Sequence, residues 1–165
     1  MSDVVNDAAN YPPVRSLLPH DGAMVLLDRV LSADDDNLCA EVRIGAATLF
    51  YDGAAVGAWV GVEYMAQAIA AHAGYLARRR GDPVKVGFLL GARRYEAQCP
   101  GFTLGSVLHV HVHRALQGEN GLGAFECRIE DRDGAPGASV ATATITVFQP
   151  ANVSEFLQES GNGSE

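Results

Sequence analysis

The most distinctive pattern in the chain is a stretch over residues 58–80 whose apolar side chains would point to every side of a helix. It contains no proline, and its only run of polar residues is formed by the last three, which are all arginine. A helix that is apolar on all sides is normally a buried helix. Gly81 and Pro83 follow as stop signals. The pattern therefore predicts one long buried helix.

Outside this stretch, the apolar positions alternate as they do in β-strands. We predict a hairpin before the helix and four long strands after it, over residues 24–32, 38–44, 84–98, 105–116, 122–131 and 138–148. Residues 45–57 read as irregular. No second helix is left for parallel crossovers, so the sheet should be antiparallel. Because loops cannot cover an apolar helix, the sheet must curl around it. The expected fold class is α+β, with a curled antiparallel sheet wrapped around one central helix.

The length of 165 residues fits one domain. We place it at 13–148, between tails at 1–12 and 149–165. The net charge of −8 argues against a nucleic-acid partner. The chain has no apolar run long enough for a membrane span and no signal-like start, and it has three widely spaced cysteines without a CxxC pair. We therefore expect a cytoplasmic protein with reduced thiols and no contact with a membrane.

Glu63 is the first candidate for chemistry, because it interrupts the apolar helix. Gln67 at i+4 and Trp59 at i−4 would share its face. Burying a carboxylate is costly unless it is paired or protonated, and a protonated carboxyl can serve as a general acid. The alternative is that Glu63 bonds to the backbone or lies on a solvated stripe.

His20 is the second candidate. It lies between Pro19, which restricts the backbone, and Gly22, which permits a tight turn, so it is a plausible base beside the first strand. The alternative is an ordinary surface histidine. His72 falls about 180° around the helix from Glu63 and is expected to be a buried structural residue.

Three further histidines, His109, His111 and His113, alternate along one strand and would point from one face. Three imidazoles could bind Zn²⁺. The motif contains no acidic residue, however, and side chains two apart on a strand lie about 7 Å from each other. We expect a polar outer face and no metal.

Half of the basic residues fall within one short stretch of the chain. An acidic protein with one basic patch suggests an acidic partner or a phosphate-bearing ligand, the alternative being ordinary solvated element ends. These residues are Arg78, Arg79, Arg80, Lys85, Arg93 and Arg94.

Several motifs resemble the hotdog-fold β-hydroxyacyl-acyl carrier protein dehydratases. LLPHDGAMVLLDRV at 17–30 resembles the opening of these enzymes, and EYMAQA at 63–68 resembles their central-helix motif. VGFLLGARRY at 86–95, with the turn that follows, resembles their strand with basic residues. The similarity is greatest to the small dehydratase-like proteins of bacterial aryl polyene gene clusters.

The sequence departs from this family at one position. The usual catalytic histidine lies fourteen residues before the glutamate, where this chain has Leu49, while the following phenylalanine is kept as Phe50. We assign the role of that histidine to His20 instead.

The resemblance implies reversible dehydration of a 3-hydroxyacyl thioester on acyl carrier protein. His20 would be the base, Glu63 the acid and Gln67 the residue that orients Glu63. The backbone N–H groups of Gly57 and Ala58 would stabilise the thioester oxygen. The acyl chain would lie along Trp59, Phe88 and Leu90.

The resemblance also implies partners. The carrier protein would meet Arg78, Arg79, Arg80, Arg93 and Arg94. The substrate itself carries phosphopantetheine, and no cofactor is needed. The family suggests a homodimer or a hotdog heterodimer. Two alternatives remain: a catalytically inactive partner subunit or acyl-thioester binding module, and an acyl thioesterase.

Overall fold

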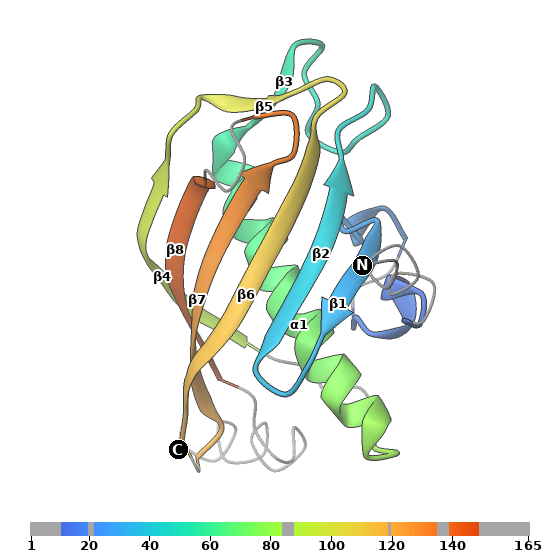
Figure 1. Ribbon diagram of the computed structural model, residues 1–165, viewed down its shortest axis with the longest axis vertical. Helices are drawn as coiled ribbons and strands as arrows, with labels where there is room; N and C mark the ends of the chain where they lie inside the picture. The colour runs from blue at the N-terminus through green and yellow to red at the C-terminus, as the bar shows by residue number, and fades with distance from the viewer. Residues whose placement is uncertain (1–10, 20–21, 84–87, 119, 135–138, 149–165) are drawn as a thin grey trace, which may run out of the picture.

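The long helix lies in the hollow of a six-stranded sheet (Figure 1). The computed structural model describes residues 11–19, 22–83, 88–118, 120–134 and 139–148. The strand order is β1-β2-β6-β7-β8-β4, and every neighbouring pair is antiparallel. The strands are β1 (Arg29–Ala33), β2 (Asn37–Arg43), β4 (Phe88–Ala97), β6 (Val107–Gln117), β7 (Leu122–Asp131) and β8 (Ser139–Phe148).

A second, two-stranded sheet lies near the start of the helix. Its strands are β3 (Ala55–Gly57) and β5 (Gly101–Thr103). The helix follows β3 at once, as a 3₁₀ turn over Ala58–Val60 and then α1 over Gly61–Arg79. Within the described part of the chain, no helix is long and apolar enough to cross a membrane.

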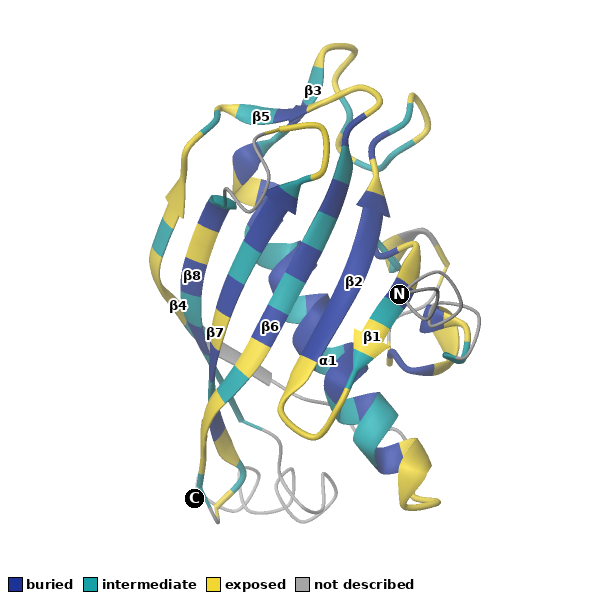
Figure 2. Cartoon of the chain, viewed as in Figure 1, coloured by how far each residue is buried: buried dark blue, intermediate teal, exposed yellow. Residues whose placement is uncertain are grey.

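The core lies between α1 and the inner face of the sheet. Along β6, Leu108, Val110 and Val112 are buried, and the residues between them lie on the outer face. Figure 2 shows this as bands of alternating burial along β6. Tyr64 and Met65 of α1 are fully buried in the same core. The predicted wrapping of a curled antiparallel sheet around one central helix is confirmed, and the sheet is not closed.

The element boundaries differ from the predicted ones mainly near the N-terminus. The first strand begins only at Arg29, because Gly22–Met24 form a 3₁₀ turn and the Leu26 N–H bonds to the side chain of Gln67 instead of to a strand. The strands β3 and β5 were not predicted. Each has three residues and lies in a segment that read as irregular or as a turn.

Two described stretches, residues 11–19 and 22–26, cover the side of α1 that the sheet leaves open. Tyr11, at the end of the predicted N-terminal tail, packs against Tyr75 with ring centroids 6.0 Å apart. Arg78 Nη1 donates to Ser16 Oγ at 3.2 Å. Between these contacts, the Leu17 carbonyl lies so close to Gly74 that a Cβ there would collide with it. The segment therefore packs directly on the helix backbone.

This close approach predicts that Gly74→Ala destabilises the protein. The added methyl group must push the Leu17 backbone away from α1, and overpacking of this kind costs about 1–3 kcal/mol. Urea unfolding measures the change. Gly91→Ala is the matched control, because a Cβ at Gly91 meets nothing within 4 Å. Equal free energies of unfolding for the two variants would contradict the predicted contact.

Candidate active site

Gln67 is the centre of the candidate site. It is fully buried, and its side chain bonds to two backbone groups of the N-terminal segment. Its Nε2 donates to the Met24 carbonyl at 2.6 Å, and its Oε1 accepts from the Leu26 N–H at 2.8 Å. The same Nε2 lies 3.5 Å from Glu63 Oε1, one turn earlier on α1. One side chain thus connects the half-buried Glu63 with the segment that follows the Leu-Pro-His motif.

His20 lies outside the described residues, as does Asp21. The described residues on both sides of them are fixed to the rest of the chain. Leu17 packs on Gly74, and Arg15 Nη1 donates to the Gly22 carbonyl at 3.1 Å.

The two predicted oxyanion donors, the backbone N–H groups of Gly57 and Ala58, point in different directions at the start of the helix. The Ala58 N–H donates to the Pro100 carbonyl at 3.1 Å, so this donor is already used. Hydrogen-bonded and non-bonded pairs alternate along an antiparallel ladder. Because Ala58 pairs with Pro100 in this way, the Gly57 N–H is directed away from β5. It is directed instead toward the segment in which Tyr51 forms an antiparallel bridge with Val56.

Trp59 lies at the surface, in contact with Phe50. Trp59 is 66% exposed, and its ring meets that of Phe50 edge to face at a centroid distance of 5.2 Å. The indole folds back over Gly57, where a Cβ would collide with it. In this single chain Trp59 therefore does not form the wall of an enclosed tunnel. The side chains of Phe88 and Leu90, the other predicted tunnel residues, lie outside the described residues.

Phe50 has an unusual backbone. Its φ of 71° lies in the left-handed region, which bulky residues rarely adopt and which costs on the order of 1 kcal/mol or more. It directly follows Leu49, the half-buried residue at the position of the usual family histidine. Strain of this kind is frequent at functional sites.

The structure does not bring the five predicted carrier-protein arginines together in one chain. Arg79 lies beside the β1–β2 turn, where its Nη1 contacts Asp35 Oδ1 at 2.8 Å. Arg93 and Arg94 belong to β4, the opposite edge strand of the sheet (Figure 1). The sequence analysis grouped the arginines of α1 and β4 into one patch because they are close in the chain, but the fold separates them.

His72 is a buried structural residue, as predicted. It is 1% exposed, and its Nε2 lies 3.0 Å from the Asp34 carbonyl oxygen. Burial lowers the pKa of His72, because the charged imidazolium would lose its hydration. It packs toward Phe125 and contributes to the core.

Comparison with known proteins identifies the family. A family model described as ApeP dehydratase matches residues 12–158. The chain belongs to the ApeP-like dehydratase family. A solved structure of the dehydratase heterocomplex ApeI:P from Xenorhabdus doucetiae is 32% identical to this chain. The match covers 90% of this chain and 97% of that one, with a TM-score of 0.80. The resemblance to the dehydratases is confirmed.

More distant structures share the hotdog fold alone. A hypothetical thioesterase with coenzyme A from Streptococcus pneumoniae is 19% identical, covers 73% of this ApeP-like chain and 86% of its own, and has a TM-score of 0.56. The E. coli PaaI protein from the phenylacetic acid degradation operon is 14% identical, with coverages of 72% and 80% and a TM-score of 0.56. A search of the curated proteins gave no match.

Sequence reasoning missed the main partners of Gln67. Helical spacing correctly placed Gln67 beside Glu63, but its short hydrogen bonds go to Met24 and Leu26. A buried glutamine in an apolar helix was the available signal, because such an amide must find partners for both its donor and its acceptor.

Gln67→Leu is expected to loosen the N-terminal segment. The Leu26 N–H would lose its acceptor, so its exchange with solvent should become roughly tenfold faster, the equivalent of one hydrogen bond. Amide hydrogen exchange read at single residues measures this. The Asp28 N–H, which donates to the Glu41 carbonyl at 2.8 Å, is the internal control and should keep its rate. Unchanged exchange at Leu26 would show that Gln67 does not hold this segment.

Proposed function

We propose that this protein dehydrates a 3-hydroxyacyl thioester carried on acyl carrier protein. The proposal rests on one observation above all: Gln67 joins the Glu63 carboxyl to the backbone of the segment that follows the Leu-Pro-His motif. Membership of a dehydratase family supports the same reaction.

The reaction needs one base and one acid on the two sides of the C2–C3 bond. In our proposal, His20 takes the C2 proton, and Glu63 gives a proton to the departing C3 hydroxyl, which leaves as water. Gln67 donates to Glu63 Oε1 from a position fixed by its own backbone contacts. Transfer of the proton from His20 back to Glu63 through solvent restores the starting state. The chemistry requires neither a metal nor an organic cofactor.

The thioester oxygen gains negative charge when the C2 proton leaves. In the proposal it lies near the start of α1, where the positive end of the helix dipole and the Gly57 N–H stabilise it. The exposed pair of Phe50 and Trp59 provides an apolar surface for the acyl chain beside this point.

The carrier protein is proposed to dock near the C-terminal end of α1. Arg78, Arg79 and Arg80 are all exposed there, on an otherwise acidic protein. Carrier proteins are acidic, so this end of the helix has the complementary charge.

Mass spectrometry with a 3-hydroxyacyl carrier protein tests the reaction. The wild-type protein should convert the substrate to the enoyl product with loss of one water. Glu63→Gln and His20→Ala should each lower the rate by about 10²–10⁴-fold, the usual contribution of a general acid or base. Release of a free carrier-protein thiol would instead identify a thioesterase.

Two matched substitutions control for effects on the fold. Glu126→Gln and His113→Gln change the same residue types at exposed positions on the outer face of the sheet. Both should keep the wild-type rate. Full activity of Glu63→Gln would remove Glu63 from the mechanism, and full activity of His20→Ala would remove His20.

A second candidate is a subunit that supports an active partner and performs no chemistry itself. Leu49 at the position of the family histidine favours it. The similar structure from Xenorhabdus doucetiae was solved as a heterocomplex, which supports pairing with a second hotdog subunit. Absence of turnover by this chain alone, with turnover restored by such a subunit, would favour the second candidate.

In both candidates we propose that the apolar surface at Trp59, beside the acyl chain, also contacts a second chain. Light scattering should give the mass of two subunits for wild-type protein, or for the mixture with its partner. Trp59→Asp should shift the mass toward one chain, because a carboxylate would be buried in the interface. Leu116→Asp is the control, since Leu116 is 67% exposed against 66% for Trp59. A wild-type monomer in both samples would contradict the pairing.

A further inference from the structure

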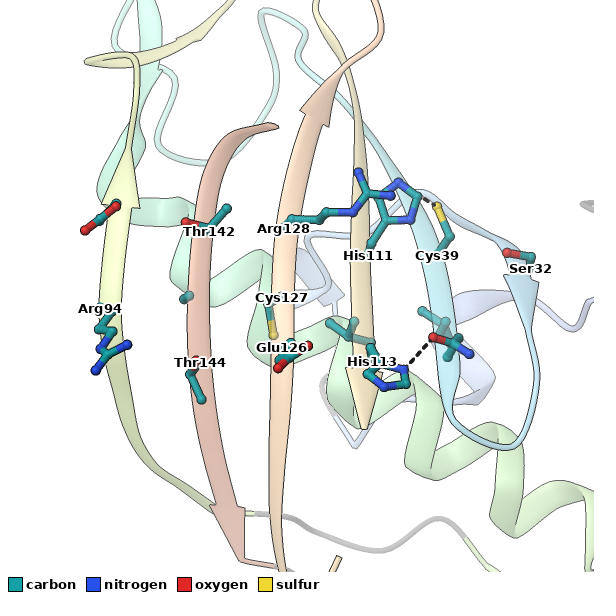
Figure 3. Close-up of a pocket in the computed structure, with 15 residues that line it drawn as sticks. Ser32, Cys39, Arg94, His111, His113, Glu126, Cys127, Arg128, Thr142 and Thr144 are labelled. Atoms are coloured by element: carbon teal, nitrogen blue, oxygen red, sulfur yellow. Dashed lines mark hydrogen bonds between the residues drawn. The ribbon is translucent and has the colours of Figure 1, made fainter. Parts of the chain in front are cut away.

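The outer face of the sheet holds a cluster of ligand-type side chains on three neighbouring strands. In the β2–β6 ladder, Cys39 lies opposite His111, and Glu41 lies opposite His109. In the β6–β7 ladder, His109 lies opposite Glu130. Figure 3 shows Cys39 and His111 directed toward each other from β2 and β6. This face is opposite the one that packs on α1, so the cluster is separate from Glu63.

The donor atoms already lie close to coordination distances. Cys39 Sγ is 3.9 Å from His111 Nε2. One donor atom from each of Cys39, His109 and His111 lies within 4.8 Å of the others. In a tetrahedral zinc site, bond lengths near 2.3 Å to sulfur and 2.0 Å to nitrogen place these atoms about 3.5 Å apart. Small side-chain rotations would bring the three donors onto one ion.

A carboxylate lies beside the cluster, although it is not among the three residues whose donor atoms all lie within 4.8 Å of one another. Glu130 Oε1 lies 2.5 Å from His111 Nε2, and Glu130 is 9% exposed. Arg128 Nη1 also contacts this oxygen, at 2.8 Å, but the Arg128 side chain is 43% exposed and has room to turn toward solvent. Glu41 is less suitable, because Arg29 and Arg43 both hold it, at 3.1 and 2.7 Å.

A metal ion would displace the thiol proton of Cys39 to solvent when it binds.

A path from solvent to the cluster exists. A surface pocket of about 660 Å³ opens on the outer face, and Cys39, His111 and Arg128 are among the residues that line it (Figure 3). His113 lies on the same face, but its Nδ1 is 2.8 Å from Asn37 Oδ1 and it is not part of the cluster.

We propose that Cys39, His109 and His111 bind a transition-metal ion of the Zn²⁺ type, with Glu130 as the fourth ligand. The ion connects β2, β6 and β7 on the outer face and takes no part in dehydration. The sequence argument against a metal considered the histidine motif alone, whereas the missing sulfur and carboxylate come from the two neighbouring strands.

Cobalt binding to the full chain tests the proposal. After removal of metal with a chelator, the protein is titrated with Co²⁺, and absorption is recorded. We expect one ion per chain, a thiolate-to-cobalt charge-transfer band and the visible bands of a tetrahedral site, all removed by added Zn²⁺. Cys39→Ser should abolish the charge-transfer band. His109→Gln and His111→Gln should each weaken binding at least tenfold while the thiol remains in place.

Matched variants separate this site from incidental binding. His113→Gln removes a histidine from the same face of β6, and Cys99→Ser removes a different thiol, so both should bind Co²⁺ as the wild type does. Circular dichroism shows which variants are folded, and the two histidine variants decide the question if Cys39→Ser does not fold. No charge-transfer band in folded wild-type protein would overturn the proposal. An equal loss of binding in His113→Gln and His111→Gln would also overturn it.

Discussion

A helix that is apolar on nearly every side cannot be buried by one face of a single sheet. It needs further cover on its other side, and this constraint determines the architecture of the molecule. The six-stranded sheet covers one side of α1, and the N-terminal segment, described over residues 11–19 and 22–26, covers another. That segment can approach the backbone of α1 because Gly74 has no side chain. Gln67 also forms hydrogen bonds with two backbone groups of the segment. The need to bury α1 therefore also places Glu63 beside the chain that continues from the Leu-Pro-His motif.

The elements with a clear pattern of hydrophobic and polar positions could be predicted from the sequence. The buried helix and the strands β2, β6, β7 and β8 appear close to their expected positions, because burial on one face or on all faces leaves a clear pattern. β3 and β5 could not be predicted in this way. They are three residues long and form only because the start of α1 meets a turn more than forty residues later in the chain.

The candidate site was predictable in its residue types and less so in its contacts. Glu63 and Gln67 could be identified from the sequence because polar side chains in an apolar, buried helix require hydrogen-bonding partners. The partners of Gln67 lie 43 and 41 positions away, so helical spacing could not identify them. The same limit applied to the histidines of β6, whose neighbours Cys39 and Glu130 depend on strand order and register. Nearness in sequence was misleading for the arginines, which the fold separates to opposite edges of the sheet.

The left-handed backbone at Phe50 has a consequence for the evolution of this surface. A glycine at this position would adopt the same backbone without steric cost. It would also remove the ring that packs against Trp59. A substitution of Phe50 by glycine would therefore relieve backbone strain but would lose the exposed aromatic pair. Such a trade-off is common where stability and activity compete. A phenylalanine here lowers the stability of the chain in return for the exposed aromatic surface to which the proposed function assigns the acyl chain and the second subunit.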